Sequence, residues 1–422
     1  MIVFFPVAGS AQTARNPFAD LFGRSPSQAS GEFTSVQLRS TAGAQVGQTL
    51  RADFEQTDVV PDGFAAAADV SLNAQHITNR VQLLGTGRYA YQEFREGRAF
   101  GAPAFDLGGR VNFDLTTRVS VQGGGQFMRS PYFRLMWLPT AIYGPIAGAG
   151  ADGTAILMMS NDSAEASGGI TAQVGRRTAV NASGFTRQTK FDGAPQSDFA
   201  AVGGRVLLTR QLTRSLGLRA GYTRESLRVT PEFGADDYVN EIIDVGVDFS
   251  KSFSMGRRTT FGFSTETSMV RQNADRRRMR LNGTIGFERR FLRTWITQIG
   301  ARRATEFVPG FRAPVFTDRG NASIAGYLNK RLILNAGADG GRGAVGIGDA
   351  RYFRSYSGNA SLTFALTRHF GVFGQYVYYQ YEMPPDPLAL VTVQHLSRQA
   401  VSIGVKTWFS LIDKEQVPRD PR

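Results

Sequence analysis

Arginine side chains recur on the polar side of alternating segments, and their chemistry is the most readily interpreted in this chain. A guanidinium group donates two parallel hydrogen bonds to a carboxylate or a phosphate, so it suits internal ion pairs and anionic ligands alike. Carboxylates such as Asp244, Asp248 and Glu288 fall on the same side. The arginines in this pattern are Arg88, Arg110, Arg187, Arg205, Arg219, Arg280 and Arg302. Two interpretations remain open: a network of ion pairs that braces the fold, or a positive lining that guides anions through a water-filled passage.

A second basic cluster surrounds residues 273–279. Its members are Arg271, Arg276, Arg277 and Arg278. We interpret the cluster as extracellular. It could funnel an acidic solute, hold the phosphate groups of lipopolysaccharide, or form a solvated loop tip.

Catalysis is not indicated. A hydrolase needs a base, usually His, within reach of its nucleophile, and the chain has only three His, which are scattered. His76 and His369 fall beside predicted turns, and His395 falls in a predicted loop where Asp386 could pair with it. With no Cys and no cluster of metal-ligand residues, we expect no enzyme activity, no metal site and no cofactor.

Composition points to β structure. The 422 residues include 48 Gly and 17 Pro, which are poor helix formers, and no run of 18 apolar residues occurs. The net charge of +13 is compatible with nucleic acid, an anionic membrane or an acidic solute as a partner. Of these three, we expect no nucleic acid.

An alternating segment, a short polar turn and a second alternating segment recur about every 35–60 residues. Val111–Val121, Val206–Leu218 and Leu362–Phe373 are examples, and the turns often carry Thr-Arg or Arg-Arg. Period-2 alternation around a turn is the signal of a β-hairpin. Eight turns, a terminal strand and a first strand within Gln45–Phe54 predict about 18 strands, with 16 as the alternative.

The apolar side of these segments suits lipid. Ile243, Val245, Val247 and Phe249 alternate with charged or small residues. Aromatic residues fall in two tiers near the strand ends: Phe113, Phe249, Phe287, Phe364 and Phe409 in one, and Tyr91, Phe127, Tyr222 and Tyr376 in the other. A soluble sandwich would bury the charged side at high cost. We therefore predict an all-β, transmembrane, antiparallel up-and-down β-barrel with short periplasmic turns and long extracellular loops in a bacterial outer membrane.

The two chain ends suggest the following boundaries. Residues 1–11 are interpreted as the remnant of a signal peptide, residues 12–43 as a flexible periplasmic tail, residues 44–409 as the barrel and residues 410–422 as a polar periplasmic tail. Val401, Ile403, Val405 and Phe409 form one apolar face of the last strand. This pattern resembles the signal read by the barrel assembly machinery, which implies that machinery as a partner.

The longest predicted loop, Ser130–Glu165, is unusually apolar for an exposed segment. It contains Trp137, Ile142, Tyr143 and Met158, and an apolar patch of that size implies burial against something. Three interpretations remain open: a plug or constriction inside the barrel, a cap over its mouth, or extra strand beyond the membrane.

Across nearly its whole length, the chain resembles bacterial outer-membrane β-barrel porins. Leu208-Thr209-Arg210 followed by Leu218-Arg-Ala-Gly-Tyr222, and Leu366-Thr-Arg-His-Phe370 followed by Gln375-Tyr376, look like motifs of the barrels associated with exopolysaccharide secretion. That resemblance implies an outer-membrane conduit that exports an acidic exopolysaccharide with a periplasmic polysaccharide-export protein. A passive anion-preferring diffusion porin and a plugged structural barrel or receptor are the alternatives. Outer-membrane lipid and lipopolysaccharide are the expected surroundings, and the oligomeric state is left open.

Overall fold

The computed structural model describes residues 32–52, 62–94, 100–131, 160–192, 198–213, 215–229, 236–253, 259–272, 276–292, 294–308, 311, 313–347, 351–382 and 395–416. The strands are β1 (Glu32–Ala52), β2 (Gly63–Ile77), β3 (Val81–Phe94), β4 (Phe100–Asp114), β5 (Val119–Ser130), β6 (Asn161–Gly175), β7 (Thr178–Phe191), β8 (Phe199–Gln211), β9 (Leu216–Val229), β10 (Asp236–Phe253), β11 (Thr259–Gln272), β12 (Arg276–Phe291), β13 (Trp295–Glu306), β14 (Val315–Asn329), β15 (Leu332–Val345), β16 (Arg351–Ala365), β17 (Phe370–Glu382) and β18 (His395–Gln416). Within these ranges, no helix is long and apolar enough to cross a membrane.

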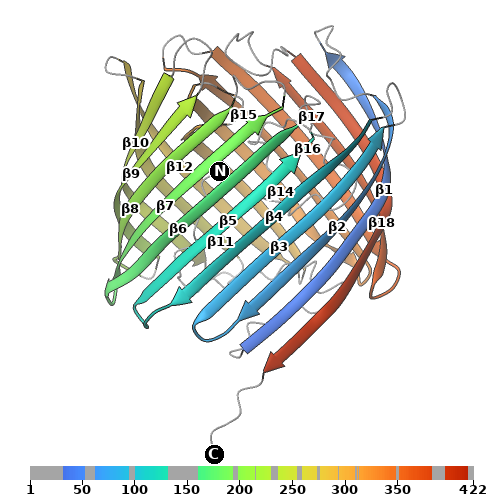
Figure 1. Cartoon of the computed structure of the whole chain (residues 1–422), viewed down its shortest axis with the longest axis horizontal. Coiled ribbons are helices and arrows are strands. Elements are labelled where there is room, and N and C mark those ends of the chain that lie inside the picture. Colours follow the sequence, from blue (N-terminus) through green and yellow to red (C-terminus); the bar gives the residue numbers. More distant parts are fainter. Residues whose placement is uncertain are drawn as a thin grey trace, which may run out of the picture.

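The 18 strands form one antiparallel sheet that closes on itself (Figure 1). Each strand pairs with the next one in sequence, and β18 pairs with β1 from Glu32↔Gln416 to Ala52↔Leu396. Closure gives every strand a partner on both sides, although the β12–β13 ladder is incomplete, and it satisfies most backbone hydrogen bonds, as a β structure in lipid requires. The predicted up-and-down barrel of 18 strands is therefore confirmed.

Short turns at one end of the barrel follow directly from their threonines. The Thr78 hydroxyl accepts a hydrogen bond from the backbone N–H of Val81 at 3.0 Å, and Thr116 accepts one from Val119 at 3.0 Å. Thr213 does the same for Leu216 at 3.1 Å. A Thr side chain that satisfies an N–H two or three residues later stabilises a tight turn. The recurring Thr-Arg signal in the sequence thus marks the hairpins correctly.

The outward face of the wall is apolar. The exposed large side chains include Leu107, Val202, Val206, Val245, Met279, Leu281, Ile285, Val401 and Ile403, all at outward positions of their strands. Phe113, Phe127, Tyr222, Tyr376 and Phe409 are also exposed, so the aromatic residues of both predicted tiers point outward. An apolar band flanked by aromatic residues is the surface that a transmembrane barrel presents to lipid, and this exterior agrees with the predicted outer-membrane location.

A charge placed in the middle of this band tests the lipid-facing assignment. We expect Val245→Arg on β10 to destabilise the inserted barrel by about 2–4 kcal/mol, because the guanidinium must enter hydrocarbon. Thr86→Arg on the inward face of β3 is the matched control and should have little effect. The folded fraction after refolding into lipid vesicles measures both, and equal behaviour of the two variants would contradict the assignment.

The barrel is longer at both ends of the chain than the sequence indicated. Strand β1 begins at Glu32 rather than near Gln45, and β18 continues to Gln416 rather than ending at Phe409. Residues 32–43 and 410–416 are therefore wall and not tail. The reason is their pairing: each supplies the ladder partners of the other, and β1 also pairs with β2. The remainder of the two predicted tails lies outside the described residues.

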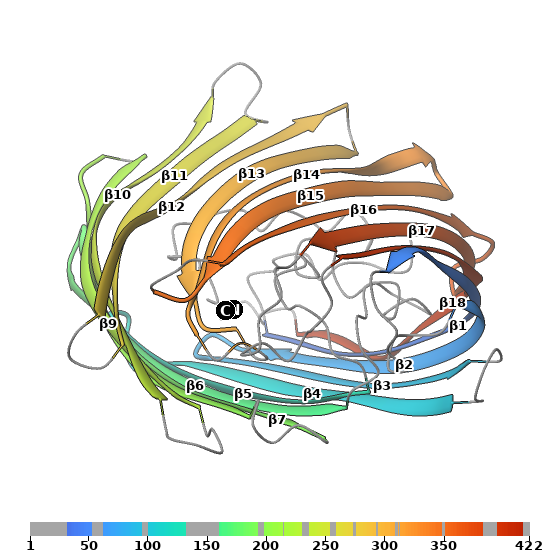
Figure 2. The ribbon, with the colours of Figure 1, turned by 90° about the horizontal axis from the view of Figure 1, so that it is seen from above.

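The wall divides between β12 and β13. Strand β12 pairs with β11 from Arg276 to Arg289, but its described ladder with β13 runs only from Phe291↔Trp295 to Gly283↔Arg303. The two strands separate beyond Gly283, on the side away from the short turn that joins them. We call this point the fork. Beyond it, β13, β14 and β15 continue as one paired layer, and Figure 2 shows the strands from β13 onward displaced toward the interior relative to β10–β12.

Candidate functional site

Asp244 on β10 is the centre of the predicted arginine network. Its carboxylate accepts hydrogen bonds from Arg205 on β8 and from Arg219 on β9, each at 2.6 Å. Arg219 also reaches Asp248 at 2.8 Å and the Thr265 carbonyl at 3.0 Å, so it ties together β9, β10 and β11. The Asp244 side chain is only 1% exposed. A carboxylate this deeply buried is stable only because two guanidinium groups compensate its charge.

Most of the other predicted arginines are also ion-paired. The pairs are Arg88–Asp69 at 3.5 Å, Arg187–Glu165 at 3.3 Å, Arg280–Asp318 at 2.6 Å and Arg302–Glu306 at 2.7 Å. Arg110 lies on the inward face of β4, the face that also carries Asp106 and Asn112. The interpretation as a network that braces the fold therefore accounts for much of the arginine pattern.

Within several pairs, the two partners are unequally exposed. Arg205 is 30% exposed against 1% for Asp244, and Arg302 is 30% exposed against 11% for Glu306. Arg88 and Asp69 show the same order, whereas Arg187 and Glu165 show the reverse. In the Arg205, Arg302 and Arg88 pairs the carboxylate therefore sits against the wall and the guanidinium is nearer to the water of the lumen.

Above the fork, the outward side of β13 and β14 packs on the inward side of β11 and β12. Thr305 bonds to Ser268 at 2.9 Å and to Asn282 at 3.3 Å, and all three side chains are buried. Phe316 on β14 lies beneath the guanidinium of Arg278, at 4.2 Å from its ring centroid. These contacts replace the missing ladder and hold the layer formed by β13–β15 inside the barrel.

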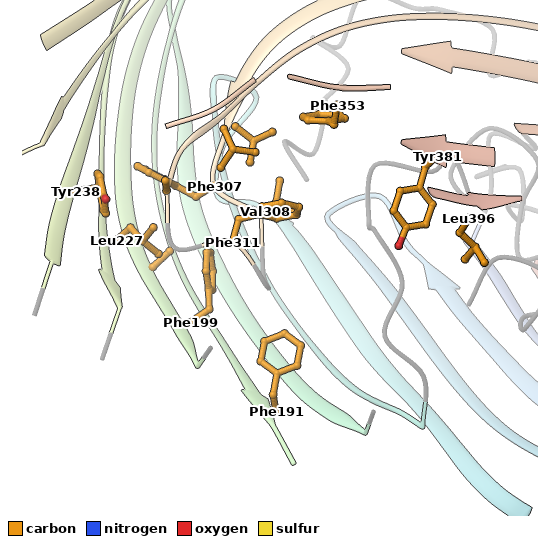
Figure 3. Packing of buried hydrophobic residues seen from close by; sticks show 14 of the residues in the cluster. Phe191, Phe199, Leu227, Tyr238, Phe307, Val308, Phe311, Phe353, Tyr381 and Leu396 are labelled. Atoms are coloured by element: carbon orange, nitrogen blue, oxygen red, sulfur yellow. The ribbon is translucent and has the colours of Figure 1, made fainter. Parts of the chain in front are cut away.

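An apolar cluster crosses the lumen from this inner layer (Figure 3). The connection from β13 to β14 contributes Phe307, Val308, Phe311 and Ala313. On one side these residues meet the wall residues Phe191, Phe199, Ala201, Leu227 and Tyr238, which come from β7–β10. On the other side the cluster includes Val345, Phe353, Tyr379, Tyr381 and Leu396, which come from β15–β18. Because these two groups of strands lie on opposite parts of the ring, the cluster narrows the passage.

An apolar plug inside the barrel was one of three interpretations of the predicted loop Ser130–Glu165, and it stays a prediction. Residues 132–159 of the predicted loop Ser130–Glu165 lie outside the described residues, and its ends belong to β5 and β6. Among the described residues, the connection between β13 and β14 enters the lumen and carries Phe307, Val308 and Phe311. The same signal of an apolar run in an expected surface loop was present there and could have found it.

The basic cluster occupies strands and not a loop. Arg271 belongs to β11 and Arg276, Arg277 and Arg278 belong to β12, since the connection between them spans only residues 273–275. The Arg278 side chain turns inward and donates a hydrogen bond to the Gly346 carbonyl at 3.2 Å, while Arg271 lies at an outward position. Arg271 and Arg278 therefore lie on opposite sides of the wall, because alternation turns successive side chains to opposite faces. Binding of anions or lipopolysaccharide there stays a prediction.

The other sequence-predicted residues lie as follows. Val401, Ile403, Val405 and Phe409 form the outward face of β18, and their recognition during assembly stays a prediction. His76 bonds to Thr34 at 2.9 Å and His369 stacks on Phe409. His395 begins β18 rather than lying in a loop. In the part of the chain that the structure describes, no group of three or more metal-ligand residues occurs.

Comparison with known proteins adds little to this geometry. No family model and no curated protein matches the chain. Among solved structures, OccK7 (OpdD) of Pseudomonas aeruginosa is 9% identical, covers 91% of this chain and 100% of its own, and has a TM-score of 0.47. OccAB3 of Acinetobacter baumannii is 10% identical over 89% and 99%, with a TM-score of 0.45. The FrpB iron transporter of Neisseria meningitidis is 7% identical over 89% and 82%, also with a TM-score of 0.45. At these levels the argument for fold and site rests on the strand ladders and contacts of the chain itself.

Proposed function

We propose that this protein is an outer-membrane channel for hydrophilic solutes, narrowed by the apolar cluster. The observation that carries the proposal is the contrast between the two faces of one closed wall. The outward face is apolar and aromatic, and the inward face carries charged groups such as Arg205, Arg219 and Asp248. Charged side chains inside a barrel are inexpensive only where water reaches them.

For the solute, we propose a preference for anions. The support is the unequal exposure within the ion pairs: Arg205 and Arg302 face the lumen more than Asp244 and Glu306 do. A passage lined in this way places partly exposed cations along the route, which lowers the electrostatic barrier for an anion relative to a cation of the same size.

The apolar cluster favours a small anion over a polymer as the solute. A small anion needs only a gap beside Phe307 and Phe311, whereas export of an acidic exopolysaccharide with a periplasmic partner requires the whole cluster to move aside. We therefore place the small-solute channel first and polymer export second. A permanently plugged barrel that serves as an anchor or receptor is the third reading.

Ion conduction in a planar bilayer tests the proposal directly. We expect the purified protein to give a stable single-channel conductance, with a reversal potential under a salt gradient that reports anion preference. Cation preference would contradict the assigned lining. Silence from a folded, heat-modifiable barrel would remove the channel proposal in favour of the plugged reading.

A further inference from the structure

A row of charged residues crosses the outward face of the wall at the end opposite the short turns. Strand pairing aligns Arg303 with Asp318, Asp318 with Arg342, Arg342 with Arg354 and Arg354 with Glu382. These residues belong to β13–β17 and occupy outward positions of their strands. Asp318 lies at the fork, where the inward-facing Arg280 also reaches it.

Positive charge exceeds negative charge in this row. The Asp318 carboxylate is shared: Arg303 contacts it at 2.7 Å, Arg280 contacts it at 2.6 Å through the fork, and Arg342 reaches it only at 3.8 Å. The side chains of Arg303 and Arg342 are 52% and 75% exposed. Two of these guanidinium groups thus keep donors available toward the outside of the barrel.

The row lies at the boundary of the apolar band. On β16, ten residues separate Arg354 from the aromatic Phe364 near the opposite end of the strand. At about 3.3 Å per residue and a tilt of about 40°, this distance corresponds to roughly 25 Å along the membrane normal, which is the height of the apolar band of such barrels. The arginines are therefore at the level of lipid headgroups.

Directly below the row, the exterior is unusually smooth. The next outward positions are aligned as Ala301↔Gly320 and Gly320↔Gly340, and the positions after them as Ala322↔Ala338 and Ala338↔Gly358. Larger side chains border this area, with Ile299 on β13 and Tyr356 on β16. We call this area of small outward side chains, which the Tyr356 ring borders at Gly340, the trough.

We propose that this exterior face of β13–β16 binds a phosphorylated glycolipid of the outer leaflet. Arg303 and Arg342 hold its phosphate with charge-assisted hydrogen bonds, and its acyl chains lie in the trough of small residues. A guanidinium pair beside an apolar trough matches a headgroup phosphate that is covalently joined to acyl chains. A free phosphate would contact the guanidinium pair but not the trough. The inference rests on the outer-membrane location and is independent of which solute crosses the lumen.

Direct lipid titration tests the site. The purified barrel in detergent is titrated with bisphosphorylated lipid A, and bound lipid is counted by native mass spectrometry. We expect the double variant Arg303→Gln/Arg342→Gln to weaken binding at least tenfold. Ala338→Phe, which fills the trough without changing charge, should weaken it several-fold.

Arg129 provides the matched control. It is 44% exposed on the exterior of β5 and lies 3.7 Å from both Asp162 and Asp192, so its charge is already compensated. We expect Arg129→Gln to bind as the parent does, and the dephosphorylated lipid to bind the parent as weakly as phosphorylated lipid binds the double variant. Unchanged binding by the double variant, or an equal loss in Arg129→Gln, would overturn the proposal. Conductance recorded on the same samples is expected to stay at the parent level, so a failure of lipid binding is distinguishable from a failure of the channel.

Discussion

Replacing Phe307 and Phe311 together by serine is expected to raise the single-channel conductance several-fold. Both side chains are buried in the cluster that crosses the lumen, and the Phe307 ring lies 6.5 Å from the ring of Tyr238 on the opposite wall layer. Removing two buried phenyl groups abolishes the contacts that hold the connection against β7–β10. Each loss weakens local packing by about 3–5 kcal/mol, yet the hydrogen-bonded wall does not depend on either residue.

The control for this variant is Phe373→Ser. Phe373 is also buried on the inward face, where Lys406 lies 4.5 Å from its ring centroid, but it is not a member of the cluster. It loses similar packing without opening the passage, so its conductance should remain near that of the parent. A folded Phe307→Ser/Phe311→Ser barrel with unchanged conductance would show that the cluster is not the narrowest part of the route.

Arg219→Leu is expected to destabilise the barrel by about 3–5 kcal/mol. The substitution removes one of the two cations on the buried Asp244 carboxylate and also leaves Asp248 and the Thr265 carbonyl without this donor. Unfolding by urea in lipid vesicles, followed by the loss of heat-modifiability, measures the change. Adding Asp244→Leu to the same chain should recover part of the loss, because the uncompensated buried carboxylate is then gone.

Arg290→Leu serves as the comparison for Arg219→Leu. Arg290 pairs with Glu288 at 3.1 Å, and the two side chains are 38% and 28% exposed, so water reaches both and we expect a loss of less than about 1 kcal/mol. Equal losses in the two variants would refute the distinction between a buried brace and a solvated pair. Asp244→Asn should shift the reversal potential toward stronger anion preference, since it removes a carboxylate and keeps both guanidinium groups.

The barrel could be predicted from the sequence because its signals are local. Alternation across Phe105–Leu115 or Ile243–Phe249 reports which side of a strand meets lipid, and a threonine such as Thr116 reports where the chain turns. Each hairpin joins two strands that are adjacent in the sequence, so counting hairpins gives the strand number. The ends of the first and last strands were underestimated because their alternation is weak there and their pairing spans the whole chain.

The interior could not be predicted in the same way, because it depends on contacts between distant segments. Alternation correctly placed Arg219 and Arg280 on the inward side, but nothing in their spacing indicated that Asp244 would take two arginines or that Asp318 would sit at the fork. Likewise, strict alternation gives no sign that the hydrogen-bonded ladder between β12 and β13 is incomplete. Thr305 and Phe316 occupy outward positions by periodicity and are nevertheless buried, since the layer that carries them has moved inside the barrel.

The ladder between β1 and β18 closes the barrel, and it can form only after the last strand is present. All other pairings join neighbours in the sequence, whereas this one joins residues 32–52 to residues 396–416. Bringing such distant segments together carries the largest loop-closure entropy in the molecule, and an antiparallel ladder over nearly the full length of both strands offsets it. Until the last strand is available, β1 is an unprotected sheet edge that can recruit other chains. A chain that stops before Phe370 would therefore be expected to aggregate or be degraded rather than persist as a smaller pore.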